Sequence, residues 1–214
     1  MENKKNTILL TVIAVATLLV AVVGATFAYF TAQGGSASQA DVVVQTGKAG
    51  SSSLGTFKAI NIYADATNFA QGKGDQTGTS TGTVEWTAPT NVKGGEVAEA
   101  DRTMCYTATL EITNNTFVKS AANTTDAAEL EFTAVKGSTT IIDKMDITTT
   151  KNNVQIPTTV GGTDYTHKLV ADAGATVSDS WTLTVTLKNL GVDQNDNTGK
   201  NFAGAVKFDK TNCK

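Results

Sequence analysis

Strict alternation of apolar and hydroxyl-bearing residues is the pattern that most constrains the fold of this chain. In the run WTLTVTL (181–187), the Trp, Leu, Val and Leu share one parity, and threonines fill the other. A period of two predicts a β-strand with one buried and one solvated face. The run MCYTATLEIT (104–113) alternates in the same way, and the closing run AVKFDKTNC places Val206 and Phe208 inward.

Further short runs with strand character are bounded by Gly, Asn or Asp clusters. They cover residues 57–64, 82–87, 130–135, 139–147 and 165–170. Their number and spacing predict an all-β fold, a jelly-roll-like sandwich of two antiparallel sheets. A short helix is expected over 120–130 and a polar Gly/Thr loop over 72–82.

An uncharged apolar stretch, TILLTVIAVATLLVAVVGATFAYF (7–30), follows Lys4 and Lys5 and predicts an N-terminal hydrophobic signal helix. About 20 apolar residues also span a bilayer, so a retained membrane anchor stays a second interpretation. Thr26 and Ala28 put small residues three positions before and directly before a cleavage site, which favours a cut between Ala28 and Tyr29. The expected organisation is a signal peptide (1–28), a flexible arm (29–54) and a β-sandwich domain (55–214).

The charge of the chain argues against one class of partner. The formal net charge is −3, and the single arginine is Arg102. Nucleic-acid binding rests on clustered Lys and Arg that neutralise phosphates. We therefore expect no nucleic-acid partner, and membrane contact only through the leader before it is cleaved.

The chain has two cysteines, Cys105 and Cys213, which allow one pairing. In an exported chain an even count predicts a disulfide, although two free thiols remain an alternative. Both cysteines fall on the outward parity of their runs, so the bridge is expected to join the last strand to a neighbour in the same sheet. No C-x-x-C pattern accompanies them, which makes a redox or zinc role unexpected.

The segment between the leader and the sandwich contains a short Val-rich strand candidate, DVVVQT, between two Gly/Ser-rich stretches. Ala40, Val42 and Val44 share one face. Such a strand either folds back on its own domain or pairs with an open sheet edge of another copy. The candidate assembly residues are Tyr29, Phe30, Ala40, Val42, Val43 and Val44.

The junction GATFAYF (24–30) resembles that of the TasA/camelysin family, exported proteins of Gram-positive bacteria that are processed by a dedicated signal peptidase. The run 180–208, with a Trp-led strand, an Asn/Asp-rich loop and a closing strand, looks like the last hairpin of that family. The resemblance implies a jelly-roll subunit of biofilm matrix fibres, in which the N-terminal arm of one subunit completes a sheet of the next. The cysteine pair departs from the matrix-fibre members, and the middle of the chain shows no match.

Camelysin-type members are described as metalloproteases, but a zinc protease of the H-E-x-x-H kind needs two histidines. This chain has one, His167, which we expect to be an ordinary strand or loop residue. The run DQNDNTG (193–199) spaces Asp193, Asn195 and Asn197 like a calcium loop, but it lacks the Gly and Glu that such a loop needs. We interpret it as a hairpin loop, and expect no catalytic residue, metal or cofactor.

These observations predict a secreted structural protein that assembles with itself into extracellular or cell-surface fibres by donor-strand pairing. Signal peptidase would be its partner during export. A membrane-anchored β-domain adhesin or pilin-like subunit with the leader retained is the first alternative. A camelysin-like surface metalloprotease is the second, and the single histidine weighs against it.

Overall fold

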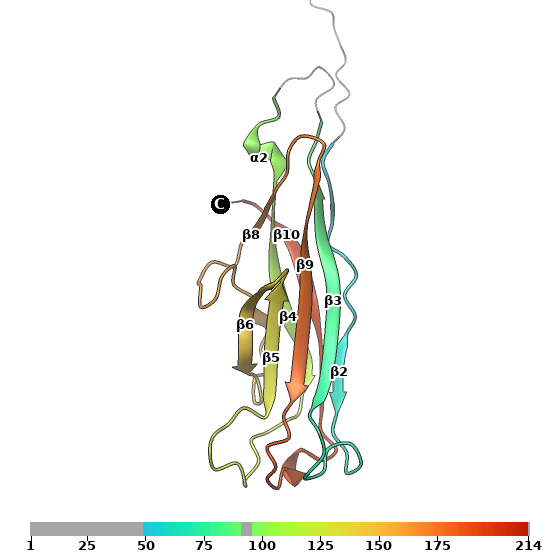
Figure 1. Ribbon diagram of the computed structural model, residues 1–214, viewed down its shortest axis with the longest axis vertical. Coiled ribbons are helices and arrows are strands. Elements are labelled where there is room, and N and C mark those ends of the chain that lie inside the picture. Colours follow the sequence, from blue (N-terminus) through green and yellow to red (C-terminus); the bar gives the residue numbers. More distant parts are fainter. Residues whose placement is uncertain (1–48, 91–95, 214) are drawn as a thin grey trace, which may run out of the picture. The chain divides into compact units, whose positions relative to one another are not determined.

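The computed structural model describes residues 49–90 and 96–213, which belong to one compact unit. Within these ranges the regular secondary structure is almost entirely β-strand, in two antiparallel sheets packed face to face (Figure 1). The expected two-sheet antiparallel sandwich is therefore confirmed. No described helix is long and apolar enough to cross a membrane, and the hydrophobic run 7–30 lies outside the described residues.

The first sheet has the strand order β1-β3-β9-β5-β6. Its long central pair, β3 and β9, is in register over all twelve residues. Figure 1 shows this sheet in front of the second one. Its strands are β1 (Ser51–Ser53), β3 (Gln76–Thr87), β9 (Thr176–Leu187), β5 (Leu130–Lys136) and β6 (Thr139–Asp146).

The second sheet has the order β2-β10-β4-β7, and β8 also pairs with β4. Its centre is the long antiparallel pair of β4 and β10. Its strands are β2 (Ile60–Tyr63), β10 (Asn201–Thr211), β4 (Thr103–Asn115), β7 (Val154–Gln155) and β8 (His167–Val170).

The core lies between the two sheets and follows the predicted parities. All four apolar residues of the run 181–187 are buried, as are the inward residues of β4 from Met104 to Leu110. Burying a side chain of this size contributes roughly 1.5–3 kcal/mol relative to leaving it exposed. The largest fully buried side chains come from both sheets and include Trp181, Tyr106, Phe117, Phe132 and Phe202.

The prediction of a Gly/Thr loop over 72–82 is wrong for residues 76–82, because β3 already begins at Gln76. Gly78 lies against Ile60 at the start of β2, and Gly82 lies against Phe57 in the segment between β1 and β2. A Cβ atom would come within 2.7 Å of Ile60 at position 78 and within 2.6 Å of Phe57 at position 82. The glycines are therefore small inward residues of a strand, and the threonines between them form its outer face.

The prediction of a short helix over 120–130 is also wrong. The segment consists of turns, and Leu130 opens β5. Asn123 makes local hydrogen bonds with its side chain: its Nδ2 donates to the carbonyl of Ala127 and its Oδ1 accepts from the amide of Ala127. Such side-chain bonds compete with helical backbone bonds. The helices in the described part are α2 (Glu99–Arg102) and the 3-10 helix η1 (Asn195–Asn197).

Candidate assembly site

The N-terminal arm joins the sandwich through β1, at one edge of the first sheet. Ser51 pairs with Thr87 and Ser53 with Glu85, so three of the twelve residues of β3 are paired on this side. The end of the segment expected as a flexible arm (29–54) is thus a strand of the sandwich. Gly50 lies against Trp86, where a Cβ atom would come within 2.4 Å of the ring. Position 50 therefore favours glycine, and the chain enters the sheet at a sterically fixed point.

Trp86 connects this entry point to the second sheet. Its indole Nε1 donates to the carbonyl of Arg102 over 2.8 Å, and Arg102 ends α2 directly before β4. The ammonium group of Lys210, on β10, lies 5.3 Å from the centre of the Trp86 ring, within the range of a cation–π interaction. Trp86 therefore links β3, next to the entry point, with the start of β4 and with β10 in the second sheet.

Most edge strands of the described sandwich are short: β1 has three residues, β2 and β8 have four, and β7 has two. In addition, no described strand pairs with residues 76–84 of β3 on the side of β1. The longest edge strand is β6, with eight residues. There Lys144 has a φ of 47°, and the register with β5 shifts twice. Short, bulged and charged edges disfavour uncontrolled edge-to-edge pairing of sandwiches.

The predicted cleavage and assembly residues lie outside the described part of the chain. They are Ala28, Tyr29, Phe30, Ala40, Val42, Val43 and Val44. Their roles stay predictions.

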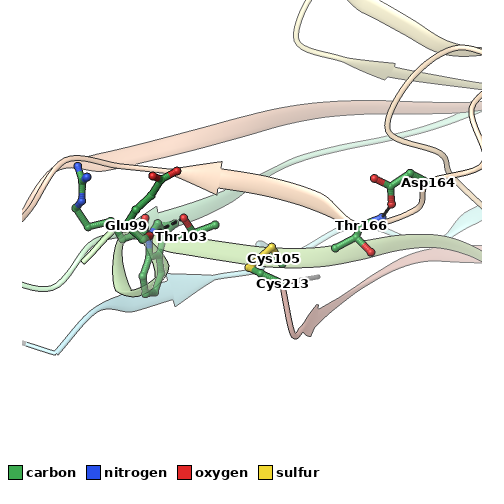
Figure 2. The surroundings of a disulfide bond; sticks show 8 residues. Glu99, Thr103, Cys105, Asp164, Thr166 and Cys213 are labelled. Atoms are coloured by element: carbon green, nitrogen blue, oxygen red, sulfur yellow. Dashed lines mark hydrogen bonds between the residues drawn. A yellow bond between two sulfur atoms is a disulfide. The ribbon is translucent and has the colours of Figure 1, made fainter. Parts of the chain in front are cut away.

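Cys105 and Cys213 form a disulfide with a Cα–Cα distance of 5.2 Å (Figure 2). Cys105 lies on β4, and Cys213 follows β10, its antiparallel neighbour in the same sheet, as expected. Although Cys105 has outward parity, it is buried, with Cys213 lying against it. The bridge closes a sequence separation of 108 residues. In the chain-entropy model a loop of this size stabilises the fold by up to about 4.7 kcal/mol.

A polar cluster around Asp179 crosses the core from one sheet to the other. The hydroxyl of Tyr106, on β4, donates to Asp179 on β9 over 2.5 Å, and Lys136 on β5 forms an ion pair with the same carboxylate at 2.8 Å. The indole of Trp181 donates to the Tyr106 oxygen over 3.1 Å. Burial and the neighbouring Asp179 carboxylate raise the pKa of Tyr106, so its hydroxyl stays protonated. The cluster ties three strands together.

His167 packs inside this cluster as a core residue. Its ring stacks on Tyr106 and meets Trp181 edge-on, each at a centroid distance of 5.1 Å. Nε2 lies 3.1 Å from the carbonyl of Ile156, and Nδ1 has no hydrogen-bond partner among the described residues. Burial lowers the pKa of His167. The described residues contain no group of three or more His, Cys, Asp or Glu side chains placed to hold a metal ion.

Glu129 is a fully buried carboxylate that holds together the loops at one end of the sandwich. It accepts hydrogen bonds from the amide and hydroxyl of Ser120 at 2.7 and 2.8 Å, from Asn123 at 3.0 Å, from Gln194 at 2.8 Å and from Asn197 at 2.7 Å. Burial alone would raise the pKa of Glu129, but these hydrogen bonds outweigh it and the pKa lies below its ordinary value.

The loop 193–199 uses its polar side chains to hold its own shape. Asp193 accepts a bond from the amide of Asn195, and Asp196 from the amide of Ala121. Asn197 is buried and donates to Glu129 and to the carbonyl of Val118. The loop between β9 and β10 is therefore fastened to the preceding loops. Its interpretation as a hairpin loop is wrong, because β9 lies in the first sheet and β10 in the second, so the loop crosses from one sheet to the other.

Sequence analysis did not identify Glu129 and Asp179. A signal was available for Asp179, because this residue shares the parity of Trp181 and Leu183 and so places a charge on the buried face of β9. Glu129 directly precedes β5 and carries no such signal, since its partners Gln194 and Asn197 lie more than 60 residues away in the chain.

The described part of the chain thus defines a disulfide-linked antiparallel β-sandwich that is entered through a short edge strand. No family model matches this chain, and neither a curated protein nor a solved structure matches it.

Proposed function

We propose that this chain is an exported structural subunit that polymerises at the cell surface or in the extracellular matrix. In the proposed polymer, the N-terminal arm of one copy, freed by cleavage after Ala28, adds a strand to a sheet of the next copy. The resemblance of the junction 24–30 to the TasA/camelysin family supports this class of protein. The disulfide fits export, because such bonds persist in oxidising compartments.

The observation that carries the proposal is the fixed entry of the chain at Gly50. Five residues lie between Val44 and Gly50, and an extended chain spans at most about 3.6 Å per step, or about 20 Å over these six steps. The central strands β3 and β9, with twelve residues each, are about 40 Å long. Ala40 is ten steps from Gly50, or at most about 36 Å, so this tether is long enough for a strand at 40–44 to meet a neighbouring copy, where the proposal assigns it.

Backbone pairing suits this arrangement physically. A strand that adds to a sheet gains main-chain hydrogen bonds, and its alternate side chains fill pockets. A head-to-tail contact that does not close on itself generates a filament. The short strands β1, β2, β7 and β8 and the bulged strand β6 disfavour other modes of sheet-to-sheet pairing at their edges.

The experiment compares the exported wild-type chain with a variant that keeps residues 1–28 and lacks 29–46. We expect fibres from the wild type and soluble, folded monomers from the variant, seen by electron microscopy and sedimentation. A finer pair of variants is Val42→Lys/Val44→Lys, which should block assembly, and Gln45→Lys, which should not. Fibres formed by the arm deletion would overturn the proposal.

A further inference from the structure

The outer face of β3 and β9 carries an uncharged array of hydroxyl groups. The outward residues of the two strands form six directly opposed pairs, and eleven of the twelve side chains are Thr or Ser. The exception is Glu85. We call these twelve residues the threonine face: Thr77, Thr79, Thr81, Thr83, Glu85, Thr87, Thr176, Ser178, Ser180, Thr182, Thr184 and Thr186.

Three of these pairs are close enough for hydrogen bonds between their hydroxyls. The oxygens are 3.4 Å apart in Thr77 and Thr186, 3.3 Å in Thr79 and Thr184, and 2.8 Å in Thr87 and Thr176. A hydroxyl has one proton to donate and two lone pairs. Each bonded pair therefore keeps one donor and several acceptor positions for another partner.

We propose that the threonine face binds the threonine face of a second copy, so that filaments associate side by side. This inference rests on the proposed function, because only a filament repeats the threonine face along its length. The contact itself involves only the sandwich. Because a hydroxyl both donates and accepts, two identical arrays are complementary to each other. An array of charges of one sign would instead repel its copy.

The charge distribution supports a second copy as the partner. The chain carries a net charge of −3, yet the threonine face holds one carboxylate among twelve positions, so two copies meet there with little repulsion. The face has no Lys, Arg or aromatic side chain, which are the groups that bind phosphates and stack on bases.

The size of the face predicts a weak contact between single subunits. Twelve strand residues extend about 40 Å, and two strands with their side chains are about 10–15 Å wide, which gives roughly 400–600 Å² per partner. Stable complexes bury about 800 Å² per partner. One pair of faces therefore associates weakly, whereas many faces repeated along a filament add their contributions.

The test places two positive charges in the middle of the face, in the variant Thr81→Lys/Thr182→Lys. These residues are exposed and directly opposite each other. The matched control, Thr107→Lys/Thr113→Lys, adds the same charges to outward positions of β4 in the other sheet. Unchanged thermal midpoints would establish that both variants fold as the wild type does.

We expect wild-type and control filaments to form bundles in electron micrographs, and the threonine-face variant to form single filaments. In sedimentation of the full mature chain held below its assembly concentration, we expect subunit association at least tenfold weaker for the face variant. Equal bundling and association in all three proteins would overturn the inference. A neutral polysaccharide is the other partner to be tested. If the face variant loses retention on such a polysaccharide but keeps the self-association of the wild type, the inference is overturned as well.

The arm deletion separates this inference from the proposed function. Chains that lack 29–46 are expected to lose filaments but to keep the weak association through the threonine face. If they keep filaments, the donor-arm proposal fails while the face is still tested by its own variants.

Discussion

The two outer faces of the sandwich are built differently. On the first sheet, β3 and β9 present paired hydroxyls and one carboxylate. On the second sheet, the outward side of β4 and β10 carries Lys207, which pairs with Asp209 at 3.2 Å and with Glu111 at 3.8 Å, and the Cys105–Cys213 bridge. The face of the second sheet carries a disulfide and several charges, whereas the face of β3 and β9 is regular and carries one charge.

This difference separates two physical tasks. Exposed charges keep copies of a protein apart, and a disulfide resists unfolding by restricting the unfolded chain. Regular neutral hydroxyls do neither, but they let another surface approach closely. The second sheet thus resembles the stabilised side of a subunit, and the threonine face the side available for contact.

The largest change in stability is expected from removing the disulfide of the second sheet. The variant Cys105→Ala/Cys213→Ala should lose up to about 4.7 kcal/mol of unfolding free energy, because its unfolded chain regains the freedom of a long loop. Denaturant unfolding measures this loss. Reduction of the wild type should lower its stability and leave the variant unchanged. A variant as stable as the oxidised wild type would contradict this part of the comparison.

The next largest loss of stability is expected at Glu129, whose hydrogen bonds hold together the loops at one end of the sandwich. Glu129→Gln removes the charge that accepts five hydrogen bonds, and should cost about 2–3 kcal/mol. Glu131→Gln, two residues along on the outward parity of β5, is the control and should stay within about 0.5 kcal/mol.

The pH dependence gives a second check on Glu129. Its pKa is lowered in the folded state, so its contribution is present above the ordinary value of 4.5 and is lost as the pH falls through the folded pKa. Unfolding free energies of the wild type should therefore fall more steeply below pH 4.5 than those of Glu129→Gln. Parallel curves would show that the carboxylate is not ionised in the fold.

A smaller effect tests the contact of His167 with Trp181, where the second sheet meets the first. Because burial lowers the pKa of His167 from 6.5, its contribution is present above pH 6.5 and falls away as the pH drops through the folded pKa. Lys136, Asp179 and Asp164 act on the ring as well. Wild-type stability should decline as the pH falls below 6.5, and His167→Gln should remove that slope. A slope retained in this variant would assign the effect to another group.

The smallest effect is expected on the charged outer face. Lys207→Met removes the centre of the ion pairs with Glu111 and Asp209, whose side chains are about half exposed. Solvent and salt screen such pairs, so the thermal midpoint should change little, and less in high salt. A large loss would mean that the charged face stabilises the fold more than exposed pairs do.

The alternation of apolar and hydroxyl residues was enough to predict the main strands and the two-sheet fold. β9 and β4 extend through the runs 181–187 and 104–113, and their inward parities form the core. The disulfide was predictable because two cysteines allow one pairing, and the parities placed it within one sheet. These features follow from local patterns.

Features that depend on distant partners were not predictable. The first half of β3 has the composition of a loop, because its inward residues are kept small by Phe57 and Ile60 lying against them. The segment 120–130 has a helical composition, but Glu129 is drawn into a network with Gln194 and Asn197. The threonine face depends on the register between β3 and β9, whose paired residues are about 90–110 positions apart.

The most direct test of the central claim is the N-terminal residue of the chain recovered from assembled material outside the cell, determined by Edman degradation or intact mass. Our account predicts Tyr29, because cleavage after Ala28 frees the arm that joins one copy to the next. Assembled chains that begin at Met1, or that begin beyond Thr46 and so lack the arm, would contradict it.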